Sequence, residues 1–269
     1  MILNRIPFLQ GPLDTVAERL CRTMDSMDRS WSQKVEPAAR EQIEALWRLS
    51  GLEERGQPIP AAYRLFLESM GRDDNGLLEQ EWDGFSQPDI DTLLEMYSNP
   101  RNDELKERNG LTFLTHWTDA TLFLKLTGED DPPVCFDGSG GGLFSGSFEK
   151  YLFQMAFRRA EQTQFLYHIL LGGSPQDVEL ILAQAGLSPS EGGGVRALAL
   201  FEDILDGYGI EKAWFSDAVQ YCGVGPELAV RVTGTWGLNI ALSSDHHQVL
   251  REAARGVIGR LGHIMVLKP

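Results

Sequence analysis

The sequence has 269 residues, which is enough for one large domain or two small ones. A hydrophobic fraction of 42% with 23% charged residues is ordinary for a globular protein and excludes a disordered, collagen-like or coiled-coil chain. The formal net charge of −15 predicts repulsion from phosphate backbones and anionic lipid, so we expect no nucleic-acid partner and no membrane partner, and a cationic partner is favoured.

Apolar residues spaced by three and four positions predict four helices in the first hundred residues. They are centred on residues 13–24, 43–47, 63–70 and 90–97. The third is the best delimited, because Pro60 precedes it and Gly71 follows its last apolar residue. Tyr63, Phe66 and Leu67 share one stripe, so we expect them to be buried against the second helix.

Two groups of strands are predicted further along the chain. They comprise residues 111–117, 121–126 and 133–136, and then residues 218–222, 228–233 and 238–242. Helices are predicted around residues 148–155, 178–185 and 198–205, and again after a cap at Ser243, Ser244 or Asp245. This order lacks regular β-α-β alternation, so it predicts an α+β fold with helices packed on a mixed or antiparallel sheet.

Two glycine-rich stretches interrupt this pattern and could act as hinges. Residues 137–146 are typical of a mobile surface loop between a strand and a helix. Residues 188–194 could separate two lobes.

The sequence contains no motif for a metal, a cofactor or catalysis. Residues 137–142 are glycine-rich but miss the spacing of a nucleotide loop, and no GxSxG motif occurs. His246 and His247 are adjacent, and neighbouring residues of a helix point about 100° apart, so they rarely chelate one ion. We therefore predict no metal, no cofactor, no catalytic residue and no small-molecule substrate. An enzyme whose site matches no motif remains an alternative.

The cellular location is predicted from what interrupts the apolar segments. Arg5, Pro7 and Pro12 break the apolar start of the chain, which excludes a typical export signal, and no window of about 18 apolar residues occurs. The three cysteines are odd in number and far apart, so we expect reduced thiols rather than disulfides or a zinc site. These features predict a cytoplasmic protein.

The acidic residues are unevenly distributed. Residues 73–100 contain eight acidic residues and no Lys or Arg, and residues 126–149 contain five acidic residues and no Lys or Arg. Such stretches indicate either a solvated face or a surface that meets a cationic protein. The aromatic side chains within the first stretch favour an interface. The predicted binding residues are Asp73, Asp74, Glu79, Glu81, Trp82, Asp83, Phe85, Asp89, Asp91, Glu95, Glu129, Asp130 and Asp131.

Two segments carry a family resemblance. Residues 43–76 combine an apolar helix, a Pro-x-x-Tyr-Arg-x-Phe-Leu helix and a glycine, and residues 131–152 combine a Pro-Pro-Val strand with a Ser-Phe-x-x-Tyr-Leu helix. This pattern resembles the SUKH superfamily, whose founding members are cell-wall assembly regulators and whose bacterial members are largely immunity proteins. The matching positions of the first segment are Ile59, Pro60, Tyr63, Arg64, Phe66, Leu67 and Gly71.

The resemblance implies a domain organisation and a function. Residues 36–160 would be a SUKH-like core, residues 1–35 a helical extension, and residues 161–269 a C-terminal part completing the same domain, whose strands could complete the same sheet. The implied function is that of an immunity protein, which binds and neutralises a cognate bacterial toxin. Nuclease toxins are commonly basic, which suits the charge of this chain. The alternative is a regulatory scaffold of the cell-wall regulator type that binds several host proteins.

Overall fold

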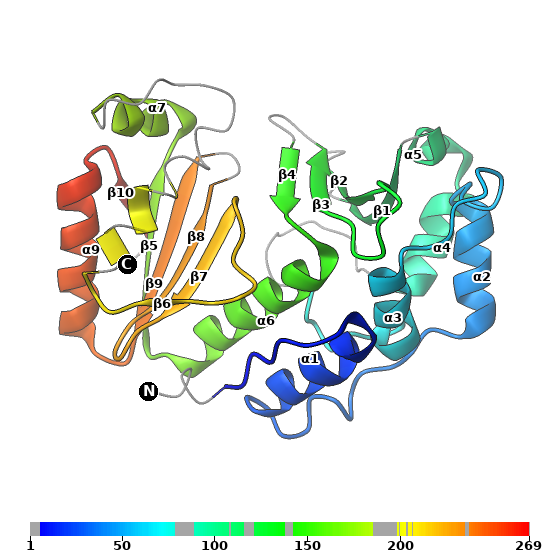
Figure 1. Cartoon of the computed structure of the whole chain (residues 1–269), viewed down its shortest axis with the longest axis horizontal. Helices are drawn as coiled ribbons and strands as arrows, with labels where there is room; N and C mark the ends of the chain where they lie inside the picture. The colour runs from blue at the N-terminus through cyan, green and yellow to red at the C-terminus, as the bar shows by residue number, and fades with distance from the viewer. Residues whose placement is uncertain are drawn as a thin grey trace. The chain divides into compact units, whose positions relative to one another are not determined.

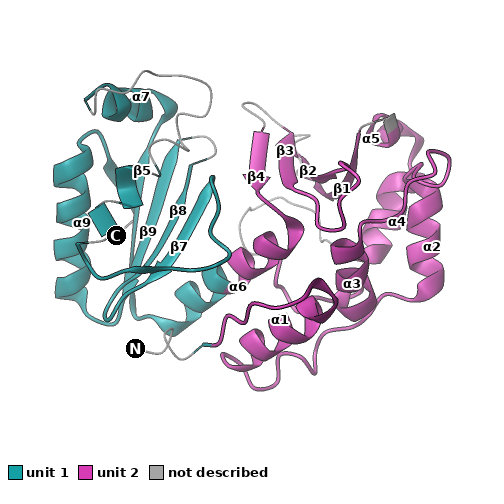
Figure 2. Cartoon of the chain, viewed as in Figure 1, with its two compact units in different colours: residues 1–6, 157–269 teal, residues 7–156 magenta. Residues whose placement is uncertain are grey.

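The computed structural model describes residues 6–78, 89–107, 109–115, 121–137, 142–184, 198, 200–202, 204–205, 207–234 and 237–268. They form an α+β fold with two antiparallel sheets, one of four strands and one of six (Figure 1). The chain divides into two compact units, residues 7–156 and residues 157–269 with the first six (Figure 2). Residues 7–35, expected as an extension, thus belong to the same unit as residues 36–156.

The helices predicted in the first hundred residues are confirmed, and two are preceded or followed by a short 3-10 turn. The elements are η2 (Leu13–Thr15), α1 (Val16–Asp25), α2 (Arg40–Leu49), α3 (Ala61–Met70), α4 (Ile90–Ser98), η3 (Pro100–Asn102) and α5 (Glu104–Glu107). As predicted, α3 starts after Pro60 and ends at Gly71. A Cβ atom at Gly71 would lie 2.6 Å from Cα of Leu67, so only glycine fits there. The Gly71 carbonyl accepts the Ile90 N–H at 2.8 Å, which joins α3 to the start of α4.

The four-stranded sheet follows these helices. Its strands are β1 (Gly110–Thr115), β2 (Thr121–Lys125), β3 (Val134–Asp137) and β4 (Gly142–Ser145), in that spatial order. The three predicted strands are confirmed. The prediction of a loop over residues 137–146 is wrong at its C-terminal end, because β4 pairs with β3 through Cys135 and Leu143. Backbone hydrogen bonding to β3 outweighs the weak strand preference of this glycine-rich segment.

The core of this unit is aromatic. Tyr63, Phe66 and Leu67 are at most 2% exposed, as predicted. The ring of Tyr63 lies 5.9 Å from that of Phe113 in β1, and the rings of Tyr63 and Phe66 lie 5.2 and 5.6 Å from that of Phe148. Their aromatic partners therefore come from β1 and from the first turn of the next helix, rather than from α2.

The unit of residues 1–6 and 157–269 contains the six-stranded sheet and its helices. These are α6 (Phe148–Gln164), which starts in the other unit, β5 (Tyr167–Gly173), α7 (Pro175–Gln184), β6 (Glu211–Lys212), β7 (Gln220–Val224), β8 (Ala229–Thr233), β9 (Leu238–Ser244), α9 (His247–Leu261) and β10 (Met265–Lys268). The strand order is β10-β5-β9-β8-β7-β6. Residues 198, 200–202 and 204–205 are also helical.

Two sequence-based expectations for this region need correction, and a third falls outside the described residues. The strands at residues 218–242 do not complete the first sheet, because they pair among themselves and with β5, β6 and β10. Ser243 and Ser244 are not helix caps but the last residues of β9, and the residue before α9 is His246, which makes no side-chain cap bond. The glycine-rich residues 188–194, expected to separate two lobes, lie outside the described residues, and the two units divide between residues 156 and 157.

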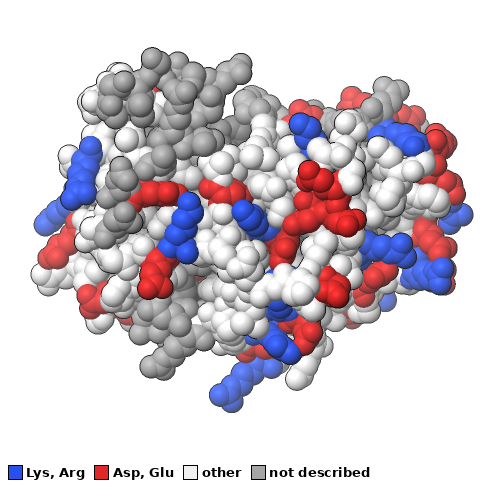
Figure 3. Space-filling model, in the orientation of Figure 1, with Lys and Arg blue, Asp and Glu red and all other residues white. Residues whose placement is uncertain are grey.

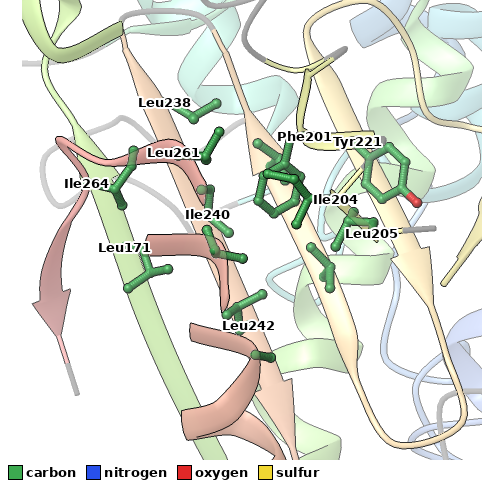
Figure 4. Packing of buried hydrophobic residues seen from close by; sticks show 14 of the residues in the cluster. Leu171, Phe201, Ile204, Leu205, Tyr221, Leu238, Ile240, Leu242, Leu261 and Ile264 are labelled. Atoms are coloured by element: carbon green, nitrogen blue, oxygen red, sulfur yellow. The ribbon is translucent and has the colours of Figure 1, made fainter. Parts of the chain in front are cut away.

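One face of the six-stranded sheet carries the second apolar core (Figure 4). Leu238, Ile240 and Leu242 alternate along β9 and point to this face, as a half-buried strand requires. They pack with residues of the neighbouring strands and of the covering helices. Among these are Leu171, Val230, Val232, Phe201, Ile204, Leu205, Leu250, Val257 and Leu261.

The opposite face of this sheet is fixed to α6 by a buried polar network. Glu161, which is 2% exposed, accepts hydrogen bonds from Nε of Arg231 at 2.9 Å and from Oγ of Ser243 at 3.0 Å. Oγ of Ser243 also lies 2.9 Å from Nδ1 of His168 in β5. The network thus connects α6 to β8, β9 and β5.

One edge of the six-stranded sheet exposes apolar side chains. β10 is an edge strand, and Met265, Val266 and Leu267 are 64%, 50% and 52% exposed. An edge strand also leaves half of its backbone hydrogen-bonding groups without a strand partner.

Candidate protein-binding surface

The structure gives Asp73 and Asp74 different environments. Asp73 is exposed, and its Oδ1 accepts the N–H of Asn75 at 2.7 Å. Asp74 is only 7% exposed, and its two carboxylate oxygens accept the N–H groups of Leu77 and Leu78, both at 3.1 Å. The carboxylate of Asp74 therefore stabilises the local backbone and has little surface left for a partner.

The predicted acidic residues of α4 also differ in role. Asp89 is the N-cap and accepts the N–H of Thr92 at 2.9 Å, which satisfies a donor that the helix leaves open. Asp91 and Glu95 are exposed and four residues apart, so they lie on the same side of the helix. Oδ1 of Asp91 accepts a hydrogen bond of 2.6 Å from the Nε2 amide of Gln42 in α2. Asp91 and Glu95 are thus available to a partner, whereas Asp89 holds the helix end.

Five of the predicted binding residues lie outside the described residues. They are Glu79, Glu81, Trp82, Asp83 and Phe85.

The segment that joins β2 to β3 carries the second group of predicted residues, and it is held at two helix N-termini. The carbonyl of Asp130 accepts the N–H of Ala62, in the first turn of α3, at 2.9 Å. Oδ1 of Asp131 accepts the N–H of Glu149, in the first turn of α6, at 2.9 Å. The positive end of a helix dipole favours negative charge nearby, so both contacts stabilise an acidic segment in this position.

Asp131 is the anchoring residue of this segment. Burial raises the pKa of its carboxyl group above the ordinary value of 3.8, and hydrogen bonds, the first of them from the Glu149 N–H, act in the opposite direction. The carboxylate of Glu149 does not add to the exposed charge, because it forms an ion pair of 2.6 Å with the buried side chain of Arg19.

Glu129 and Asp130 are the exposed carboxylates of this segment. Within the described ranges, no basic side chain lies within ion-pair distance of either one. Figure 3 shows acidic side chains gathered over the segment between β2 and β3. The surface therefore offers uncompensated negative charge on a backbone that is anchored at both Asp130 and Asp131.

The described acidic residues of α4 and those between β2 and β3 make no direct contact with one another through their side chains. No hydrogen bond or ion pair between described side chains links Asp91 or Glu95 to Glu129 or Asp130.

Sequence reasoning also missed a groove along α2. Its signal was present in the helical spacing of residues 40, 43, 44, 47 and 48.

The described part of the chain offers few signs of other kinds of site. It holds no group of three or more His, Cys, Asp or Glu side chains placed to bind a metal ion. None of its helices is both long enough and apolar enough to cross a membrane. Cys21, Cys135 and Cys222 are free thiols, and burial raises the pKa of each.

In comparisons with known proteins, no family model, no curated protein and no solved structure matches this chain. The resemblance of residues 43–76 and 131–152 to the SUKH superfamily therefore stays a prediction.

Proposed function

We propose that this protein is a cytoplasmic immunity protein that binds and neutralises a basic protein toxin. The observation that carries the proposal is the pair of exposed, uncompensated carboxylates of Glu129 and Asp130 on a doubly anchored segment. Asp91 and Glu95 extend the negative charge along α4. The resemblance to the SUKH superfamily supports the same function.

The charge of the chain supports fast association with such a partner. A net charge of −15 attracts a basic protein over distances of about one Debye length, roughly 8 Å at physiological salt. Complementary charge mainly raises the association rate and excludes wrong partners. Hydrogen bonds already hold the chain in place at Asp130 and Asp131, so binding a partner would cost less conformational entropy at this segment.

The apolar contacts of the interface belong to the proposal as well. Trp82 and Phe85 are two of the three aromatic residues of the first acidic stretch, and the third, Tyr97, is buried. Aromatic anchors commonly limit dissociation. Replacement of Trp82 and Phe85 by Ala should therefore raise the dissociation rate, whereas loss of charge should lower the association rate.

The test measures binding kinetics at low and high ionic strength. The probe is the catalytically inactive toxin domain encoded by the gene adjacent to that of this chain. In the variant Glu129→Lys/Asp130→Lys, the association rate at low salt should fall by about tenfold, and its salt dependence should flatten. The matched control is Glu179→Lys/Glu252→Lys, which reverses two exposed carboxylates of the unit that contains residues 157–269 and should give a smaller change.

Rescue of cells that express the active toxin is measured in parallel. An unchanged association rate with full rescue in Glu129→Lys/Asp130→Lys would reject this surface. Failure of the unmodified chain to bind the toxin domain or to rescue cells would reject the immunity function. Capture of several unrelated host proteins in its place would favour the regulatory scaffold.

A further inference from the structure

A groove of about 420 Å³ lies in the unit of residues 7–156, between α2 on one side and the segment 53–59 with α3 on the other. Its volume falls within the range of ligand-binding pockets. Five of its residues recur at helical spacing on one face of α2, and they span about 12 Å along the helix. The lining consists of Arg40, Ile43, Glu44, Trp47, Arg48, Glu53, Pro58, Ile59 and Arg64.

The floor of the groove is apolar and rigid. Ile43 and Ile59 are 5% and 8% exposed and belong to the core. The indole N–H of Trp47 donates to the carbonyl of Gln57 at 2.8 Å, which fixes the ring against the segment 53–59. The groove therefore meets a ligand with apolar side chains and the surface of an aromatic ring rather than with the indole donor.

The rim is charged and carries more hydrogen-bond donors than acceptors. The Nε groups of Arg40, Arg48 and Arg64 bond to the Glu44 carboxylate, the Glu44 carbonyl and the Glu68 carboxylate, at 2.9, 3.3 and 2.8 Å. A guanidinium has five N–H donors, so the Nη groups of all three side chains remain for a ligand. The carboxylate of Glu44 is paired with Arg40, and that of Glu68 with Arg64. Glu53 also lines the groove, so three of its charged lining residues are positive and two are negative.

We propose that this groove binds an acidic peptide segment that carries an apolar anchor residue. The anchor would fill the space over Ile43, Trp47 and Ile59, and flanking carboxylates would bind the free Nη groups of Arg48 and Arg64. An extended peptide rises about 3.3 Å per residue, so roughly four residues span the groove. An apolar centre inside a charged rim is the usual anatomy of a peptide or protein contact.

This inference is independent of the immunity function. The charge that it requires of the ligand is opposite to that required by Glu129 and Asp130. The protein would therefore hold two partners, or two segments of one partner, that differ in charge.

The test uses three capped hexapeptides and the ¹H–¹⁵N spectrum of the full chain. The binding probe is Glu-Asp-Leu-Phe-Asp-Glu. In the second peptide Gly-Gly replaces Leu-Phe, and in the third Lys replaces every acidic residue. The indole N–H signal of Trp47, assigned with Trp47→Phe, reports occupancy of the groove. We expect the first peptide to shift this signal in a saturable way, and the other two peptides to leave it in place.

Charge-reversal variants then locate the binding site. Arg48→Glu/Arg64→Glu should weaken binding of the first peptide by about tenfold or more, since two charge-assisted contacts are lost. Arg29→Glu/Arg101→Glu, which reverses two exposed arginines outside the groove, is the matched control and should retain the affinity apart from a small general charge effect. Thermal unfolding of each variant checks that the fold is intact.

Several outcomes would overturn the proposal. These are equal binding of the lysine peptide, saturable shifts that leave the Trp47 indole unchanged, or full affinity in a folded Arg48→Glu/Arg64→Glu variant. None of them bears on the immunity function, because that function is tested on Glu129 and Asp130.

Discussion

Single carboxylates of this chain perform different tasks although the sequence places them side by side. Asp73, Asp74, Asp89 and Asp131 each accept backbone N–H groups, but the side chains of Asp73 and Asp130 are exposed whereas that of Asp74 is buried. Charge patterning alone assigned all of them to one binding surface. The distinction depends on which backbone donors the fold brings close. Sequence spacing could reveal the local bonds of Asp74 and Asp89, but not the bond of Asp131, whose donor Glu149 is 18 residues away.

The raised pKa of Asp131 leads to a prediction of pH dependence. A carboxyl group with a higher pKa in the folded state binds its proton more tightly there than in the unfolded chain. Its stabilising contribution is therefore greatest below pH 3.8 and is lost as the pH rises through the raised folded-state pKa. The free energy of unfolding of the unmodified protein, relative to that of Asp131→Asn, should thus fall as the pH rises from below 3.8 through the raised folded-state pKa.

Urea unfolding of the unmodified protein and of Asp131→Asn at several pH values measures this difference. The effects of all other titrating groups are common to the two proteins and cancel in the difference. Asp130→Asn is the matched control, because it removes the exposed carboxylate next to Asp131. A difference between Asp131→Asn and the unmodified chain that stays constant, or that rises with pH, would contradict the assigned environment of Asp131.

At the scale of elements, α6 depends on its buried network with the six-stranded sheet. Glu161 holds Arg231 and Ser243, and its negative charge also lies close to the buried guanidinium of Arg158. The pKa of Arg158 is lowered, first by burial and then by the charge of Arg231, and Glu161 opposes this shift. Removal of Glu161 would therefore leave the largely buried guanidinium groups of Arg158 and Arg231 without the negative charge that stabilises them.

We expect Glu161→Leu to lower the free energy of unfolding by about 3–5 kcal/mol, the usual cost of breaking a buried ion pair from one side. Equilibrium denaturation measures this loss. Glu252→Leu, at an exposed position of α9, should change stability by less than about 0.5 kcal/mol. The double variant Glu161→Leu/Arg231→Met should recover part of the loss, and equal stability of Glu161→Leu and the control would refute the role of the network.

The helices were more predictable than the strands. Those around residues 13–24, 43–47, 63–70 and 90–97 follow from apolar spacing within the helix itself. Four strands, β4, β5, β6 and β10, were missed. β5 is paired on both sides, and its consecutive apolar residues Ile169, Leu170 and Leu171 hide the alternation of a strand. Strand pairing joins residues far apart in sequence, so a local pattern cannot assign it.

At the scale of the whole molecule, net charge opposes self-association through the exposed edge of β10. The charge of −15 at pH 7 falls to zero near pH 4.7, where repulsion between copies disappears. Met265, Val266 and Leu267 then offer an apolar edge with open backbone groups. We expect the protein to self-associate near pH 4.7 but not at pH 7.

Light scattering across this pH range measures the effect. Val266→Lys should reduce self-association near pH 4.7, because a charge on an edge strand disfavours pairing. Leu180→Lys adds the same charge at an apolar position of α7 that is 47% exposed, and it should reduce self-association less. Equal effects of the two variants would exclude β10 as the contact.

The fold class was predictable from the order of elements, but the division into two sheets was not. The alternation of apolar residues in β7, β8 and β9 is equally compatible with an extension of the first sheet and with a separate sheet. The pairing of these three strands with β5 and β10 decided the outcome, and both β5 and β10 were missed. The groove along α2 was also missed, because its other wall, Pro58 and Ile59, becomes a neighbour of Trp47 only through the hydrogen bond of Gln57.

The junction between α3 and α4 places a constraint on evolutionary descent. Any side chain at position 71 would collide with the backbone of Leu67, and the carbonyl of Gly71 must still reach Ile90. We therefore expect a descendant that keeps α3 and α4 to keep a glycine four residues after Leu67 and a helix-capping residue at the position of Asp89. Mutational drift can erase the charges of this protein much faster than it can erase that spacing.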